Sequence, residues 1–216
     1  MRMSRTVGSY SVVIVLLGIV LGITARNLPG RERGRARAHL MAINEAAGFV
    51  LGRAVAEALP GGGEVVLLYT PHNTEDGQAV QDAQVTGLKA ALDPGRFRCT
   101  LARSRSGPSV GDAQTDEEWL AADIEARRVA TSHAQTAALV ILTGQPEREV
   151  VRLQRDRPLV YVLNAVDNPS LRALLAEGRV RGAVVYAPDF DPTAQPESGM
   201  AVDEVFALRF RYLAGP

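Results

Sequence analysis

The sequence has 216 residues, 46% of them hydrophobic, with 24 basic and 24 acidic side chains and a formal net charge of zero. This length fits one domain with an appendage rather than two full domains. Zero net charge argues against nucleic-acid binding, which needs a surplus of basic residues to neutralise phosphates, and the single cysteine, Cys99, excludes an intramolecular disulfide or a zinc site built from cysteines.

The first predicted element is a membrane-spanning helix over residues 7–25, preceded by a short tail of residues 1–6. The 19 residues of this stretch carry no charge, and at 1.5 Å per residue they would cover about 28 Å, close to one bilayer core. The alternative is a cleaved signal peptide, since Arg2 and Arg5 form a basic n-region and Ala25 could end a cleavage site. Because the apolar run is longer than a typical signal-peptide core, we favour an uncleaved anchor.

Residues 26–37 are predicted to be an arginine-rich juxtamembrane linker, which holds one acid, Glu32, and five arginines: Arg26, Arg31, Arg33, Arg35 and Arg37. The positive-inside rule, counted strictly, would keep the following domain in the cytoplasm. A six-residue tail ahead of a single helix usually stays inside, however, and this places the domain in the periplasm. We expect a single-pass protein of the inner membrane with a periplasmic domain. The alternative is that the domain lies on the cytoplasmic side. The arginines would contact lipid headgroups, where each gains about 1 kcal/mol from anionic lipid.

Residues 38–216 are predicted to form one α/β domain, in which short apolar runs alternate with stretches of helical spacing. A helix over residues 35–59 should end at Pro60 and the three glycines that follow it. Strands are predicted at residues 64–70, 96–102, 137–143, 158–163 and 182–187. Further helices are predicted at residues 78–92, from the capping box of Thr115 and Glu118 onward, and at residues 147–155 and 169–177.

The predicted fold is a three-layer, doubly wound parallel sheet of five or six strands. Runs of Val, Leu and Ile without polar interruption are typical of strands that are buried on both faces. The strands at residues 64–70, 137–143 and 158–163 should therefore be central.

The last apolar stretch, residues 205–212, could be an edge strand or a docking tail. At strand spacing it would place Phe206, Phe210 and Tyr212 on one face, and Arg209 and Arg211 on the other. Aromatic residues and arginines are enriched at interface hot spots. We therefore expect these five residues to contact a partner, unless their apolar face packs on the domain itself.

Three segments resemble one lobe of the type I periplasmic sugar-binding proteins. Residues 64–92, EVVLLYTPHNTEDGQAVQDAQVTGLKAAL, are similar to the opening strand and helix of that family, and residues 138–164 and 171–185 are similar to later parts of the lobe. The resemblance implies a Rossmann-like single lobe and favours the periplasmic side. Those proteins bind ligand between two lobes, whereas this chain has room for one. Aromatic side chains that could stack on a sugar are not expected at the strand ends.

Four polar residues that follow the predicted strands are candidate ligand-binding residues: Asn73, Gln145, Asn164 and Asp189. Open parallel sheets bind ligands beyond the carboxyl ends of their strands. The alternative is that Asn and Asp are common in turns and helix caps for purely structural reasons.

The chemistry-bearing residues form no catalytic pattern. His39, His72 and His133 lie on separate predicted elements and no nucleophile-elbow motif is present. Asp189 and Asp191 could together bind a divalent ion, although solvated loop acids are commoner. We therefore expect no catalytic residue, no metal and no cofactor.

Two functions are compatible with this sequence. The first is a non-catalytic, membrane-anchored accessory subunit that docks on other subunits of a larger membrane complex, such as a photosynthetic or respiratory one. The alternative is a membrane-tethered module that binds or senses a small solute. A wide protein interface would favour the first function, and a polar site at the strand ends would favour the second.

Overall fold

The computed structural model describes residues 30–69, 71–72, 74–103, 135–142 and 159–216. The predicted anchor at residues 7–25 and the helices expected after Thr115 and at residues 147–155 lie outside these ranges. Within them, no helix combines the length and the apolar character needed to span a bilayer. The described elements are α2 (Gly30–Ala58), β1 (Gly63–Tyr69), α3 (Glu75–Ala91), β2 (Phe97–Arg103), β3 (Thr136–Ile141), β4 (Leu159–Ala165), α5 (Pro169–Ala176), β5 (Gly182–Tyr186), α6 (Val202–Ala207) and β6 (Phe210–Ala214).

The strands form one sheet in the order β2-β1-β3-β4-β5-β6. The pairs from β2 to β5 are parallel, and β6 runs antiparallel to β5 at the edge. The expected α/β fold with a six-stranded sheet is confirmed, but the sheet is only mostly parallel, because the edge strand β6 is antiparallel. The central position of β1, β3 and β4 is also confirmed.

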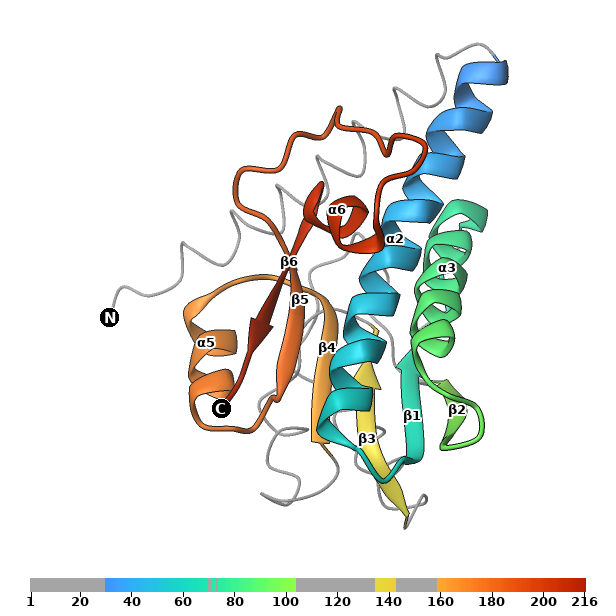
Figure 1. Cartoon of the computed structure of the whole chain (residues 1–216). Coiled ribbons are helices and arrows are strands. Elements are labelled where there is room, and N and C mark those ends of the chain that lie inside the picture. Colours follow the sequence, from blue (N-terminus) through green and yellow to red (C-terminus); the bar gives the residue numbers. More distant parts are fainter. Residues whose placement is uncertain (1–29, 70, 73, 104–134, 143–158) are drawn as a thin grey trace.

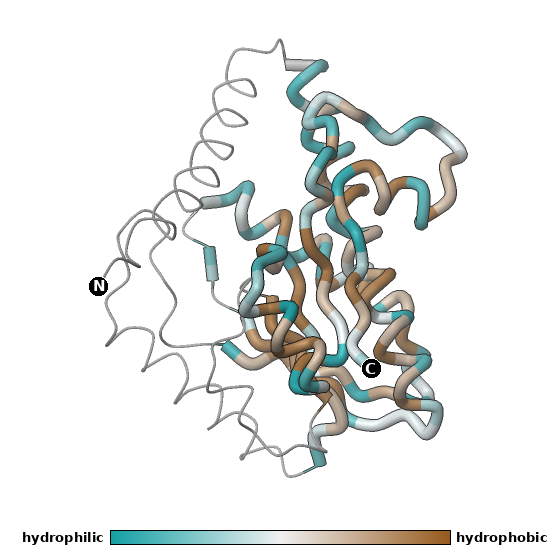
Figure 2. Tube along the Cα trace, turned by 90° about the vertical axis from the view of Figure 1, so that its left-hand side faces the viewer, coloured by the Kyte–Doolittle hydropathy of each residue, from teal (hydrophilic) through white to brown (hydrophobic). Residues whose placement is uncertain are grey.

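Helices cover both faces of this sheet (Figure 1). On one face, α2, α3 and α6 enclose an apolar cluster that includes Val65 and Leu67 of β1. On the other face, α5 packs over a second cluster that includes Val66 and Leu68. Successive side chains of a strand point to opposite faces, so β1 supplies both clusters and is buried on both sides. Figure 2 shows the hydrophobic residues concentrated at the centre of the described fold.

Helix α2 begins five residues earlier than predicted. It starts at Gly30 rather than near residue 35, so residues 30–37 of the expected linker are helical. Arg37 is held on this helix by ion pairs with the first turn of α3, at 3.0 Å to Glu75 Oε1 and 3.4 Å to Asp76 Oδ1. The helix therefore runs without interruption from the arginine-rich segment into the core.

Of the two alternatives for residues 205–212, an edge strand or a docking tail, one continuous strand is wrong. Residues 202–207 form α6, and only the part from Phe210 onward is a strand. The helix is fixed at its start by the backbone N–H of Ala201, which donates to Glu204 Oε2 at 2.8 Å. It is fixed to α2 by the bidentate pair of Arg53 with Asp203, at 2.6 and 3.1 Å.

This correction changes where the expected partner-contact residues lie. Phe206, Arg209 and Phe210 are buried in the lobe, with exposed fractions of 8%, 8% and 2%. From Phe210 onward the expected alternation holds: Phe210 and Tyr212 contact the cluster under α2, while Leu213 contacts the opposite cluster. The apolar face of this stretch therefore packs on its own domain.

Candidate functional site

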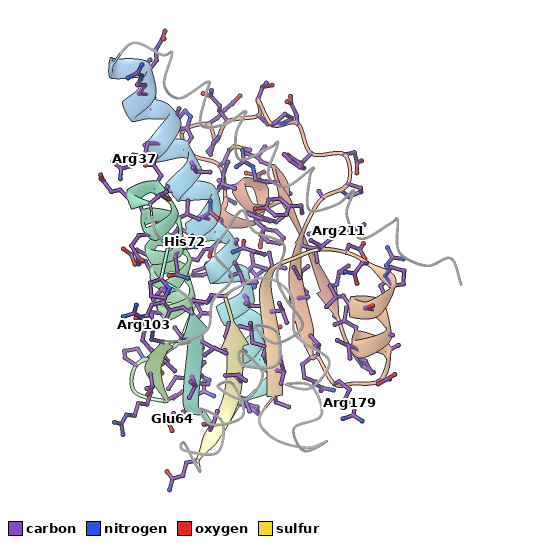
Figure 3. All side chains as sticks on the ribbon, turned by 180° about the vertical axis from the view of Figure 1, so that it is seen from behind. Arg37, Glu64, His72, Arg103, Arg179 and Arg211 are labelled. Carbon is purple, nitrogen blue, oxygen red and sulfur yellow. The ribbon has the colours of Figure 1, made fainter. Side chains whose placement is uncertain are left out.

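The carboxyl ends of the parallel strands meet at one edge of the sheet, which we call the carboxyl edge. The loops before α3 and α5 and the long segment between β5 and α6 leave the sheet there (Figure 1). Figure 3 shows Arg37 and Arg211 toward this edge, and Glu64 and Arg179 at the opposite, amino edge. In open α/β sheets, ligands bind beyond the carboxyl ends of the strands.

Two of the four candidate ligand-binding residues, Asn73 and Gln145, lie outside the described residues. Asn164 is at the end of β4 and is partly buried. Asp189 is exposed in the segment that follows β5. Both described candidates are thus at the carboxyl edge, as their positions in the sequence predicted.

The side chain of Asn164 is hydrogen-bonded to the interior of the lobe. Its Nδ2 donates to Gln84 Oε1 at 3.1 Å, and Gln84 Nε2 donates back to Asn164 Oδ1 at 2.9 Å. Gln84, which is 1% exposed, also donates to Asn44 Oδ1 at 2.7 Å. The chain of amides joins β4 to α3 and α2, and it holds Asn164 at a φ of 63°, a left-handed conformation that Asn tolerates better than most residues. Asn164 therefore positions the end of β4.

Asp167, three residues further on, connects α5 to β6. Its carboxylate accepts from Arg172 Nε and Nη2 at 2.7 and 2.8 Å, and also from Arg211 Nη2. The hydrogen bonds of Arg172 lower the pKa of Asp167, and Arg211 lowers it further. Arg211, expected to contact a partner, is thus engaged within the lobe.

We expect Asp167→Asn to lower the free energy of unfolding by about 1 kcal/mol at pH 7, the scale of a partly exposed ion pair. Because the native pKa of Asp167 lies below its unfolded value of about 3.9, the carboxylate stabilises the fold above that value. This contribution is lost as the pH falls through the native pKa. Urea unfolding of both proteins at several pH values should therefore show their difference shrinking below pH 4. A difference that stays constant down to about pH 2.5, well below the usual pKa of an aspartate, would contradict this assignment.

An aromatic–arginine group, made of Tyr186, Phe190, Arg209 and Phe210, lies where β5 ends and β6 begins. The ring centroid of Tyr186 is 5.9 Å from that of Phe190 and 5.0 Å from that of Phe210. The Arg209 Cζ atom lies 5.8 Å from the centroid of Phe190. Burial lowers the pKa of Arg209, and among the described residues no carboxylate pairs with it. The buried guanidinium of Arg209 is thus held against the ring of Phe190 without a counter-ion from the described residues.

The expectation that strand ends lack aromatic side chains is wrong. Strand β5 ends on Tyr186, one residue before the predicted boundary, and 42% of this tyrosine is exposed. The signal was present in the sequence, since the predicted strand GAVVYA already contained this tyrosine. The sequence predicted Arg209 only as a partner-contact residue. Its burial depends on the turn between α6 and β6, which the sequence did not reveal.

The other candidate groups are dispersed. Within the described ranges, no three side chains of His, Cys, Asp or Glu lie close enough together to hold a metal ion. Asp191 Oδ1 accepts from the backbone N and Oγ1 of Thr193, at 2.7 and 2.6 Å, which is a local turn contact. Cys99 is half-buried on β2, and burial raises the pKa of its thiol. Its raised pKa disfavours the reactive thiolate.

The sequence matches no protein-family model and no curated protein. The fold resembles that of the sugar-binding protein of a Bacillus halodurans sugar ABC transporter, at 18% identity and a TM-score of 0.51, over 66% of this chain and 45% of that one. It also resembles GanP, a glucose-galactose binding protein from Geobacillus stearothermophilus, at 20% identity and a TM-score of 0.51, over 66% of this chain and 47% of that one. A third similar structure, the XylFII molecule, has 14% identity and a TM-score of 0.54, over 80% of this chain and 61% of that one.

These likenesses establish the fold, since all three identities are low. The periplasmic-binding-protein-like fold expected from the sequence is confirmed. The chain spans about half the length of the two sugar-binding proteins named first.

Proposed function

We propose that this chain is a non-catalytic recognition lobe that binds a small polyhydroxylated solute, of the sugar class, at its carboxyl edge. The observation that carries the proposal is the aromatic–arginine group. Within it, Arg209 meets no described carboxylate and lies over the ring of Phe190, and this ring in turn lies beside that of the partly exposed Tyr186. The neighbours named above are binding proteins for sugars, which favours this class of solute. These neighbours do not support the accessory-subunit hypothesis. Two of the partner-contact residues that it expects, Phe206 and Phe210, are buried within the domain.

The chemistry of the group suits a sugar. An arginine presents five N–H donors in a rigid plane, which can donate to neighbouring hydroxyl oxygens. A buried charge without a partner is costly, so ligand oxygens would offset the desolvation of Arg209. The exposed part of Tyr186 offers an aromatic surface for the apolar face of a sugar ring. Arg209 would then orient the solute, and Tyr186 would supply contact area.

Calorimetric titration of the full chain in detergent with a panel of pentoses and hexoses tests this proposal. At least one sugar should bind, and Arg209→Ala should weaken that binding about tenfold or more, since hydrogen bonds to a charged group contribute about 1.5–3 kcal/mol. Tyr186→Leu should also weaken binding. It keeps an apolar side chain at the strand end, and so tests the aromatic contact if Arg209→Ala fails to fold.

Arg98→Ala is the matched control, because Arg98 is exposed near the start of β2, away from the carboxyl edge. It should bind sugar as the wild type does. The proposal fails if no sugar binds the folded wild-type chain. It also fails if folded Arg209→Ala and Tyr186→Leu variants both keep wild-type affinity.

A further inference from the structure

The first two turns of α2 carry arginines, two of which do not pack against the rest of the domain. Arg31, Arg33 and Arg35, here called the arginine collar, precede the point where Arg37 pairs with α3. Arg33 and Arg35 are exposed. Among the described residues, no carboxylate forms an ion pair with either of them. Arg33 and Arg35 are therefore basic side chains that are available to a partner.

The collar surrounds the helix instead of forming a stripe. At 3.6 residues per turn, positions 31 and 35 share one side of α2, and position 33 lies on the opposite side. A helix that lies flat on a membrane needs an apolar face opposite its basic face. Residues 30–38 have none, since Ala36 and Ala38 are their only apolar side chains. This pattern of arginine positions on opposite sides of the helix suits a helix that meets a negatively charged surface end-on.

The chain order indicates which negatively charged surface this is. The uncharged run of residues 7–25 is separated from α2 by only residues 26–29. The five Cα–Cα steps from residue 25 to residue 30 span at most about 18 Å. A lipid bilayer that holds residues 7–25 would thus have its headgroups within reach of the collar.

We infer that the arginine collar binds the anionic phospholipid headgroups of a bilayer end-on, and that it turns the carboxyl edge of the sheet toward that bilayer. Helix α2 is unbroken from Gly30 to Ala58 and its first turns project beyond the carboxyl edge (Figure 1). From Gly30 to Arg37, where α3 begins alongside, the helix rises by about 10 Å. The aromatic–arginine group would then open toward the membrane and not away from it.

Site-directed fluorescence in vesicles tests the inference. With Cys99 replaced by serine, single labels are placed at Gly34→Cys beside the collar, Asp189→Cys at the carboxyl edge, and Gly61→Cys at the amino edge. A Cβ at Gly34 or at Gly61 meets no atom within 4 Å, so both labels should be tolerated. The full chain is reconstituted in phosphatidylcholine that contains a headgroup-nitroxide lipid, with or without phosphatidylglycerol.

Quenching should be strongest at residue 34, weaker at 189 and weakest at 61. Phosphatidylglycerol should strengthen quenching at residue 34 about twofold, and high salt should reverse this gain because it screens the charges. Arg33→Glu with Arg35→Glu should abolish the dependence on phosphatidylglycerol. Lys89→Glu with Arg98→Glu, an equal charge change at exposed positions near the amino edge, should leave it intact. Equal quenching at residue 34 in both lipids, or stronger quenching at 61 than at 189, would overturn the inference.

Discussion

Val140→Asp is expected to unfold the lobe. Val140 is fully buried in β3, the third of six strands, and its register partners are Leu67 on one side and Tyr161 on the other. A carboxylate at this position would have no basic side chain in the surrounding cluster to pair with. Burying it would cost several kcal/mol, against a total stability of about 5–15 kcal/mol for an ordinary domain. Circular dichroism should show loss of the cooperative thermal transition near the wild-type midpoint.

Leu101→Asp is the matched control, because Leu101 is 49% exposed in β2 at the edge of the sheet. The same chemical change should leave the melting temperature of this variant within a few degrees of the wild type. If the Val140→Asp variant also melted there, β3 would not be the buried central strand that its apolar sequence predicts.

The central strands could be predicted from the sequence because burial on both faces leaves a direct trace in composition. Strands β1, β3, β4 and β5 begin and end within about two residues of their predicted bounds. Helix α2 was underestimated because its first turns hold Gly30, Gly34 and several arginines, and show no apolar periodicity. Its start is stabilised by Arg37, which pairs with α3, and such a tertiary contact leaves no local signal.

Helix α6 was missed for a similar reason. It has six residues, and its tie to the lobe is the Arg53–Asp203 pair, whose members are 150 residues apart in the chain. The alternation of aromatic and basic residues across 205–212 is also typical of an edge strand, so the sequence alone does not indicate the helix. Once α6 takes Phe206, Arg209 falls in a buried turn instead of on an open strand face.

The candidate site was predicted in its location but not in its residues. Asn164 was expected at a strand end and is found there, but its hydrogen-bond partner Gln84 lies 80 residues earlier on a helix. Gln84 and Asn44 look like ordinary polar positions in sequences with helical spacing. Tyr186 and Arg209 become neighbours only through the antiparallel pairing of β5 with β6. A site of this kind forms only when distant segments of the chain pair, and apolar periodicity does not predict which segments pair.

A substitution in the contact between α2 and α3 should have the second largest effect on the free energy of unfolding. Here Gly48 and Gly87 let the two helices approach closely. A Cβ at Gly87 would lie 1.9 Å from the backbone oxygen of Glu45, and a Cβ at Gly48 would lie 1.9 Å from that of Gln84. Real Cβ atoms do not come so near, and the obstructing atoms are backbone, so a substitution has to move a whole helix.

We therefore expect Gly87→Ala to lower the free energy of unfolding by about 3 kcal/mol, the upper part of the range for an overpacked core. Gly34→Ala is the control. Like Gly87, Gly34 is a helical glycine, but it lies on α2 and a Cβ there meets no atom within 4 Å. Alanine in a helix is favoured over glycine by about 0.5–1 kcal/mol, so this variant should be slightly more stable than the wild type. Urea unfolding of both proteins should give shifts of opposite sign, and shifts of equal sign would contradict the close approach.

The same displacement should reach the carboxyl edge. Gln84 lies one turn before Gly87 on α3 and bridges Asn44 of α2 to Asn164 of β4. Moving α3 away from α2 lengthens at least one of these two hydrogen bonds, because Gln84 cannot follow both partners. Hydrogen exchange in a folded Gly87→Ala variant should then accelerate at the end of β4 as well as along α2 and α3. Acceleration confined to the helices would mean that Asn164 keeps its left-handed conformation without the amide chain.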